Sequence, residues 1–531
     1  MSVGVPFNTL RDETWTRVRN QVQEANPDLQ DALDVAAVLE SLGWTDQRME
    51  ERFGLADIFQ AGEEIYNEIR QQLTQAPLPI RLTLTKKALL WSIFRDVGHG
   101  LTFTLPMIVS VAAMITLHIS FASYQYFSVA NATAIALATF LSFLTTGGFT
   151  QAMTNIYYVL MGMQKTQEIE ATVFLVMRWA MAATLGFAVM VIVGDFVFPI
   201  MPENLILLMI LYMVLLSVLW LSFTGLYILR REYYLTIITA VAIGIAYWLH
   251  LNGLAVQWAQ TVAMAAASIM SLAIALFLFR RRTRGVAALN AVFKTRLAQL
   301  AHGASPYFLY GLLYFVYIYV DRLVAWSSQT TFLPYNIWFR GQYELGMDWS
   351  LVALFLPLSV AEVLISAVMR RVQNLEHQLT VDHGLALSRS LRNTYLVILS
   401  IFGAVSAIGV VFTHIGVRLL VPVRLFSQSV PVRGVEPFVF NWSSAAYVLF
   451  SVAIFNILLL FTLSHPRPAL RALGYGILVD LAVGVLATQF LSGYQYAVWG
   501  LVVSSIFLAV YSTWTVLRLL PQLDYFLYRL S

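Results

Sequence analysis

Ionisable side chains inside long apolar segments are the residues of this sequence that could do chemistry. Four of them are candidate contacts for a polar substrate or a coupling ion: Asp321, Arg322, Glu362 and Asp480. A charge at bilayer depth costs at least about 2.5 kcal/mol, so each of these groups needs a function or a partner. The structural alternative is pairing that holds helices together. For Arg178, near the end of its segment, snorkelling to the interface is the favoured interpretation.

Tyrosines crowd the segment that carries Asp321. A tyrosine offers an apolar ring face together with a hydroxyl, which suits stacking against sugar rings in a wet groove. Within this segment the candidates for ring stacking are Tyr314, Tyr317 and Trp326. The predicted outer loop that follows adds candidate sugar contacts: Trp338, Arg340, Tyr343 and Glu344. An interfacial aromatic belt explains the ends of a span better than its middle, so the pattern favours the lining of a cavity.

The composition indicates where these groups act. Of the 531 residues, 59% are hydrophobic and 12% are charged, whereas a soluble chain carries about 25% charged residues. This balance excludes an ordinary soluble enzyme and favours a polytopic membrane protein. The chain has no cysteine, which excludes disulfides, Cys-zinc sites and thiol nucleophiles. It also lacks a Walker loop, an HExxH motif and a G-x-S-x-G motif, so we expect no catalysis, cofactor or metal.

Apolar windows of about 20 residues, the length that spans a bilayer, follow one another from Leu101 onward. Twelve such windows divide into six before and six after a basic connector. The sequence therefore predicts an all-α polytopic membrane protein with two six-helix lobes, 83–279 and 305–531, joined by a connector at 280–304. The predicted spans are 101–119, 130–161, 171–193, 204–228, 232–252, 257–279, 305–326, 350–369, 394–414, 441–463, 470–491 and 495–518.

The beginning of the chain has a different composition. Residues 1–95 contain 10 Lys and Arg against 14 Asp and Glu, whereas the remaining residues contain 23 against 15. Helix caps at Asp31, Thr45 and Asp57 predict a small soluble helical domain over residues 1–82. The acidic balance of this domain argues against a nucleic-acid partner.

Basic residues determine the predicted orientation. They follow every even-numbered span, and the loops after spans one, three, five and eleven contain none. By the positive-inside rule, the acidic domain and both termini lie in the cytoplasm of a multi-pass protein of the cell (inner) membrane. The predicted outer loops at 327–349 and 415–440 carry arginines against this rule. An even number of spans in each half is typical of transporters whose halves are related by an axis along the membrane normal.

Short motifs of the second half form a recognisable series. They are Gly311-Leu312-Leu313-Tyr314, Asp321-Arg322, Trp326, and Tyr343-Glu344 before a span that contains Pro357. This series resembles the PelG family, inner-membrane exporters of Pel-type exopolysaccharide in the multidrug/oligosaccharidyl-lipid/polysaccharide flippase superfamily. The resemblance covers about residues 85–528. It departs from the family where Arg322 replaces a lysine and where the neutral stretch Ala152–Gly162 replaces two charges.

The resemblance implies an exporter or flippase for a polysaccharide or lipid-linked oligosaccharide that works by alternating access. It also implies a cytoplasmic glycosyltransferase and other synthase subunits as partners. One alternative is a drug or lipid exporter of the same superfamily. Another is a polysaccharide polymerase or ligase that uses arginines of the predicted outer loops: Arg340, Arg418, Arg424 and Arg433. A third is a non-transporting scaffold that recruits synthase subunits through residues 1–82.

Overall fold

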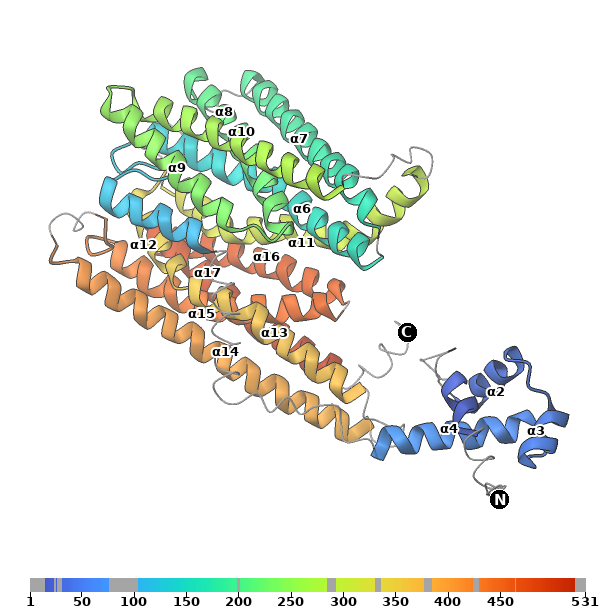
Figure 1. The fold of residues 1–531 in the computed structure, drawn as a ribbon. Coiled ribbons are helices and arrows are strands. Elements are labelled where there is room, and N and C mark those ends of the chain that lie inside the picture. Colours follow the sequence, from blue (N-terminus) through green and yellow to red (C-terminus); the bar gives the residue numbers. More distant parts are fainter. Residues whose placement is uncertain are drawn as a thin grey trace. The chain divides into compact units, whose positions relative to one another are not determined.

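The chain folds into two compact units, Met1–Ser92 and Ile93–Ser531. The computed structural model describes residues 15–22, 25, 31–75, 104–163, 165–197, 201–283, 293–329, 336–376, 384–423, 429–463 and 465–520 (Figure 1). The predicted domain boundary at residue 82 lies outside the described residues.

The first unit is a small helical domain whose helix starts agree with the predicted caps. Asp31 accepts a hydrogen bond from the amide of Asp34 at 2.9 Å, and Thr45 caps the next helix. Asp57 accepts from the amide of Gln60 at 2.7 Å. A side chain that satisfies an amide in the first turn stabilises a helix start. The helices are α2 (Ala32–Ser41), α3 (Asp46–Phe53) and α4 (Ile58–Gln75).

The second unit is helical and apolar. Among its described residues, 11 helices are long and apolar enough to cross a membrane, and Thr104–Leu117 forms a shorter apolar helix. The predicted all-α polytopic membrane fold is therefore confirmed. The elements are α6 (Val129–Gly162), α7 (Thr166–Val197), α8 (Glu203–Ile228), α9 (Tyr233–Leu251), α10 (Val256–Thr283), α11 (Phe293–Ser327), α12 (Gly341–Val352), α13 (Phe355–Glu376), α14 (Gly384–Leu420), α15 (Glu436–Thr462), α16 (Pro466–Phe490), η2 (Tyr494–Ala497) and α17 (Val498–Leu519).

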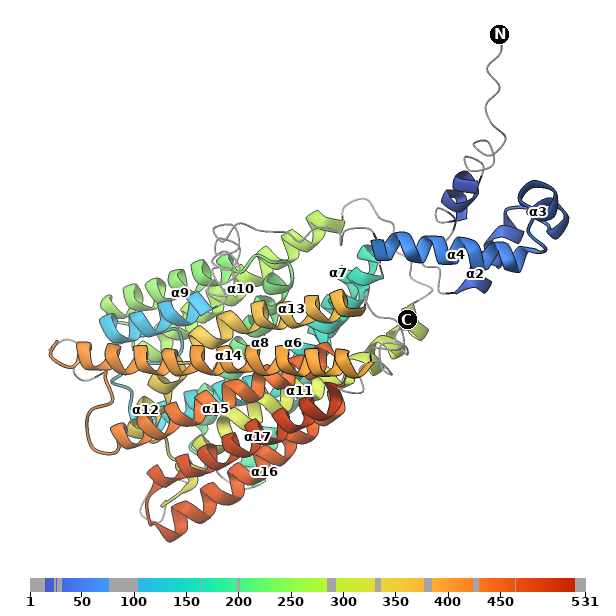
Figure 2. The same ribbon diagram turned by 90° about the horizontal axis from the view of Figure 1, so that it is seen from below.

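These helices form two bundles. Figures 1 and 2 show α6–α10 on one side of the unit and α12–α17 on the other. Helix α11 packs against α6 of the first bundle and against α16 of the second. We call the contact between α6 and α11 the seam.

Glycines bring the two helices of the seam close together. A Cβ atom on Gly148 would lie 2.7 Å from the Phe308 ring and 2.9 Å from the Phe308 carbonyl oxygen. A Cβ on Gly147 would lie 3.1 Å from the carbonyl oxygen of Gly311. Such distances are shorter than a side chain tolerates, so the backbones approach because both positions lack a Cβ.

The eighth predicted span is divided into two helices. Helix α12 ends at Val352 and α13 begins at Phe355. Between them, the amides of Ala353 and Leu354 bond to carbonyls three residues earlier, at 3.2 and 3.0 Å. Helix α12 packs against α15, whereas α13 packs against α14 and, to a smaller extent, α15. The two parts of this span therefore have different main neighbours.

The predicted outer loop at 327–349 is wrong from Gly341 onward, because α12 begins there. Gly346 allows this helix to pack closely, since a Cβ at that position would lie 2.9 Å from the Cβ of Val439 on α15. The predicted loop at 415–440 is also shorter than expected, because α14 extends to Leu420 and α15 begins at Glu436. Likewise, α10 and α11 extend into both ends of the predicted connector at 280–304.

Candidate functional site

A buried ion pair joins α11 to α12. Arg322 donates from Nη1 to Oε2 of Glu344, and their side chains are only 7% and 6% exposed. A carboxylate oxygen of Asp348 lies 3.2 Å from Nη1 and 3.3 Å from Nη2 of the same arginine, but the Asp348 side chain is 64% exposed. Glu344 and Asp348 are one turn apart on α12, so both point toward the same guanidinium.

Three further predicted residues belong to this arrangement. The Trp326 indole donates to Oε1 of Glu344 at 2.8 Å. The Tyr343 hydroxyl donates to Oδ2 of Asp321 at 2.7 Å. We call Asp321, Arg322, Trp326, Tyr343, Glu344 and Asp348 the charge cluster. Five of these six residues were candidates from the sequence, and the structure brings all five together.

Tyr343 and Glu344 do not lie in an outer loop, as the sequence predicted. They lie in the first turn of α12 and are 0% and 5% exposed. The sequence was misleading because the acids and glycines of this stretch resemble those of a loop. The charges of Glu344 and Asp348 are balanced by Arg322, which lies on α11.

The residues predicted to stack on sugar rings are covered by protein in this conformation. Tyr317 is fully buried, and its hydroxyl lies 2.9 Å from Ser504 Oγ and 3.0 Å from Ser505 Oγ. Trp326 is 1% exposed. Tyr314 is partly buried and stacks on Phe450 with 6.3 Å between ring centroids. These aromatic rings meet a glycan only in a conformation that uncovers them.

A second buried carboxylate lies on α16. Asp480 is 0% exposed and accepts from the hydroxyl of Ser504 at 3.4 Å. Both Asp480 and Asp321 approach Tyr317, whose hydroxyl shares Ser504 with Asp480. Among the described residues, Oδ1 of each carboxylate is buried without a hydrogen-bond partner. A buried carboxylate without a partner is costly, and a bound proton or small cation removes that cost.

The remaining candidates lie around α11 and α13. Trp338 donates its backbone amide to the carbonyl of Trp326 at 2.9 Å. Arg340 donates to the backbone carbonyls of Ser328 at 2.6 Å and Gln329 at 3.1 Å. Partial burial lowers the pKa of the Arg340 guanidinium below its ordinary value. These hydrogen bonds hold the segment before α12 against the end of α11.

Two residues predicted from the sequence lie partly or wholly outside the described residues. Glu362 belongs to α13, but its side chain lies outside the described residues. Arg424 lies outside them altogether.

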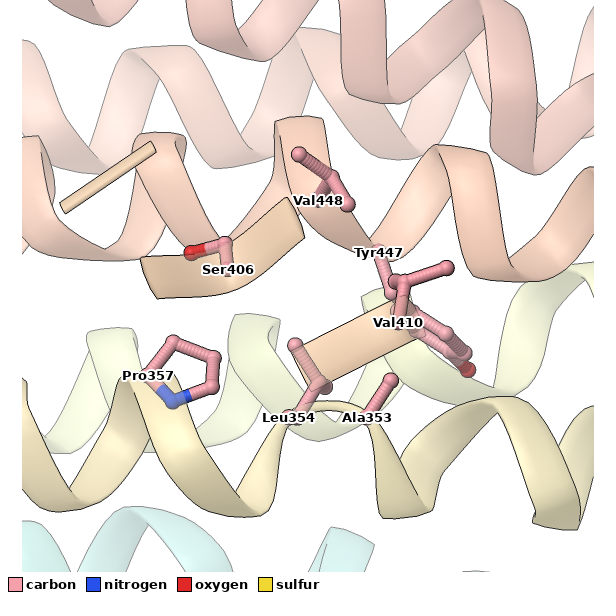
Figure 3. Close-up of a pocket in the computed structure, with 7 residues that line it drawn as sticks. All are labelled: Ala353, Leu354, Pro357, Ser406, Val410, Tyr447 and Val448. Carbon is pink, nitrogen blue, oxygen red and sulfur yellow. The ribbon is translucent and has the colours of Figure 1, made fainter. Parts of the chain in front are cut away.

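A small pocket lies where α12 gives way to α13. Figure 3 shows its lining residues: Ala353, Leu354, Pro357, Ser406, Val410, Tyr447 and Val448. The space between them leaves no room for a water molecule. Tyr447 also lies within electrostatic range of Arg322 and Asp321, so the pocket borders the charge cluster. All of its lining residues belong to the second bundle.

Three residues of the site were missed by sequence reasoning. Asp348 was detectable, because it follows Glu344 by four residues and helical spacing would place both acids on one face. Tyr447 and Ser504 carry no such signal, because their roles depend on contacts between helices far apart in the sequence.

Solved structures of transporters share this fold. A mutant of the MATE transporter VcmN from Vibrio cholerae aligns with a TM-score of 0.54 and 14% identity, covering 81% of this chain and 97% of that chain. A MOP superfamily transporter from Pyrococcus furiosus aligns with a TM-score of 0.55 and 14% identity, covering 81% and 96%. A multidrug resistance MATE family transporter in an outward-facing conformation aligns with a TM-score of 0.51 and 14% identity, covering 81% and 96%.

The chain therefore has the fold of these solved MATE and MOP superfamily transporters. No protein-family model matches the sequence, and no curated protein matches it. At 14% identity the likeness extends to the fold and not to the substrate.

Proposed function

We propose that this protein exports a polysaccharide or a lipid-linked oligosaccharide across the cell membrane by alternating access. The observation that carries the proposal is the charge cluster beside the tyrosine-rich helix α11, inside a transporter fold. A carrier of lipids or other apolar molecules needs no buried guanidinium that is paired with two carboxylates. Polar groups and aromatic rings together are the chemistry that recognises sugars. The resemblance to the PelG family supports the same substrate class.

The proposed mechanism requires the two bundles to separate at the seam. In this conformation Tyr317 and Trp326 are buried, and the pocket beside Tyr447 has no room for water. Opening the seam exposes the side of α11 that faces α6, whereas uncovering Tyr317, whose hydroxyl bonds to Ser504 and Ser505 of α17, also requires α11 and α17 to move apart. Trp338 and Arg340 then contact the glycan near the predicted outer end, and Glu362 stays a further predicted contact.

The proposed energy coupling uses two buried acids, Asp321 on α11 and Asp480 on α16. Asp321 and Asp480 each have one oxygen without a hydrogen-bond partner among the described residues. A proton or a monovalent cation bound there removes the cost of burying these oxygens without a partner. Its binding and release are the step that links an ion gradient to the movement of the bundles.

The proposed partners follow from the substrate. A long glycan has to be delivered by a glycosyltransferase on the cytoplasmic side, where we place both termini. The first unit carries helices with many exposed acids, and we assign to it the docking of synthase subunits.

The test is complementation of a strain that lacks the gene. Glu344→Gln and Asp321→Asn should each reduce surface polysaccharide at least about tenfold, because each removes a charge that has no substitute in the buried cluster. Glu203→Gln, at the exposed start of α8, is the matched control and should leave export unchanged. Normal polysaccharide in both cluster variants, at normal protein levels, contradicts the assignment.

A second candidate is a drug exporter. It is favoured by the fold shared with a multidrug resistance transporter. Increased drug sensitivity of the deletion strain without a polysaccharide defect would decide for it. A polymerase or ligase would be supported instead if the purified protein extended a glycan in vitro.

A further inference from the structure

We propose that Tyr319 couples the charge cluster to the seam, so that a change of charge in the cluster alters the contact between the bundles. The proposal builds on the proposed function, because it concerns the movement that transport requires. Its test needs no substrate, however, so the two can fail independently.

The ring of Tyr319 contacts both regions. On the side of α6, its centroid lies 5.1 Å from the ring of Phe140 and 6.4 Å from the ring of Phe143. Toward α12, the guanidinium carbon of Arg322 lies 5.6 Å from the same centroid. Tyr319 and Arg322 are three residues apart on α11, so they share one face of that helix. One aromatic ring therefore lies between the first bundle and the buried cation.

The ring of Tyr319, and not its hydroxyl, makes these contacts. The hydroxyl of Tyr319 forms no hydrogen bond to any of the described residues. A guanidinium near an aromatic ring is attracted by the negative ring face, and the attraction depends on its position above the ring. Phenylalanine at this position should therefore preserve the coupling, whereas an aliphatic side chain should abolish it.

The cluster determines where the guanidinium lies. Arg322 is held by Glu344 and Asp348, and losing the charge on Glu344 would shift it toward the remaining carboxylates. That shift changes the contact with Tyr319 and, through Tyr319, with Phe140. The seam leaves little room for adjustment, because glycines bring its helices close together and aromatic rings pack around them.

A second connection between the cluster and α6 supplies the control. Trp326 lies 5.8 Å from the Phe339 ring, and the backbone amide of Phe339 donates to Thr133 Oγ1 at 3.0 Å. This link uses a backbone hydrogen bond and contains no cation. Thr133→Val removes it and leaves Tyr319 in place.

The test is a double-mutant cycle on the full-length protein. The chain contains no cysteine, so Leu251→Cys on α9 and Leu419→Cys on α14 accept spin labels without further changes. Both side chains are well exposed, at 66% and 68%. Pulsed electron paramagnetic resonance then gives the distance distribution between the bundles in detergent or nanodiscs, without substrate.

We expect Glu344→Gln to change the ratio of the short-distance to the long-distance population. The change should be the same in the original background and in the Tyr319→Phe background. In the Tyr319→Leu background the change should be at least about threefold smaller. Phe140→Leu should reduce it in the same way, whereas Thr133→Val should leave it intact. An equal response with Tyr319→Leu and Phe140→Leu would overturn the proposal. If Tyr319→Leu does not fold, the Phe140→Leu result decides alone.

Discussion

The face of α11 that packs against α6 consists of glycines and aromatic rings, whereas the side that contacts α12 carries charges. Van der Waals contacts such as Phe143 on Phe315, 4.4 Å between centroids, are not directional and re-form after separation. The ion pair of Arg322 and Glu344 is buried, so moving one partner leaves an unpaired charge. The comparison agrees with the proposed opening at the seam, because the contacts there can separate without leaving an unpaired charge, whereas those of the charge cluster cannot.

The largest effect is expected from Arg322→Met. Removing one partner of a buried ion pair costs about 3–5 kcal/mol, because the remaining carboxylates lose their counter-charge. We expect a lower midpoint of thermal unfolding in detergent. The double variant Arg322→Met/Glu344→Met should regain part of the loss, since the buried Glu344 then no longer carries an unpaired charge, while Asp321 and Asp348 still lack their cation. A single variant as stable as the original protein would show that the cluster does not hold α11 to α12.

Gly311→Ala tests the other face. The added Cβ would collide with the carbonyl of Gly147, and such overpacking costs about 1–3 kcal/mol unless the helices move apart. We expect an increased distance between spin labels on the two bundles. Gly186→Ala is the matched control, because a Cβ there meets open space. Equal distances in both variants would mean that the seam tolerates a side chain and is not a close contact.

Asp480→Asn should affect ion dependence more than stability. The amide still accepts the hydrogen bond from Ser504, and a buried charge disappears. We expect the free energy of unfolding to change by about 1 kcal/mol or less, while export loses its dependence on pH or on sodium. Asp480→Glu keeps the charge and should retain that dependence. Unaltered ion dependence in Asp480→Asn would remove this residue from the coupling step.

The smallest effect is expected from Asp348→Asn. This side chain is 64% exposed, and exposed ion pairs contribute about 0–1 kcal/mol. The change in thermal stability should be well below that of Glu344→Gln and should decrease further at high salt. A loss of thermal stability as large as that of Glu344→Gln would show that the exposed Asp348 contributes as much as the buried Glu344.

The spans, the helix starts of the first unit and part of the charge cluster were predictable, because each depends on a local sequence pattern. Apolar windows predicted the spans, and caps such as Asp31 and Thr45 predicted the starts of the first helices. Charges in apolar surroundings identified Asp321 and Arg322, because such groups need partners wherever they lie.

The rest depends on contacts between distant segments. Helix α12 was taken for a loop, because Glu344 and Asp348 lower its hydropathy and their counter-charge lies on α11. Gly311 belonged to a recognised motif, but its role next to Gly147 exists only once α6 and α11 meet. The sequence does not distinguish Tyr319 from the other tyrosines of α11, because its contacts with Phe140 and Arg322 appear only in the folded structure.

The break between Val352 and Phe355 has a consequence for local stability. In a continuous helix, opening at one end is limited by the hydrogen-bonded turns that follow. Here α12 is held by the charge cluster and by α15, while α13 packs mainly on α14. The two halves of this span should therefore exchange their amide hydrogens as separate units, with α12 exchanging more slowly than α13.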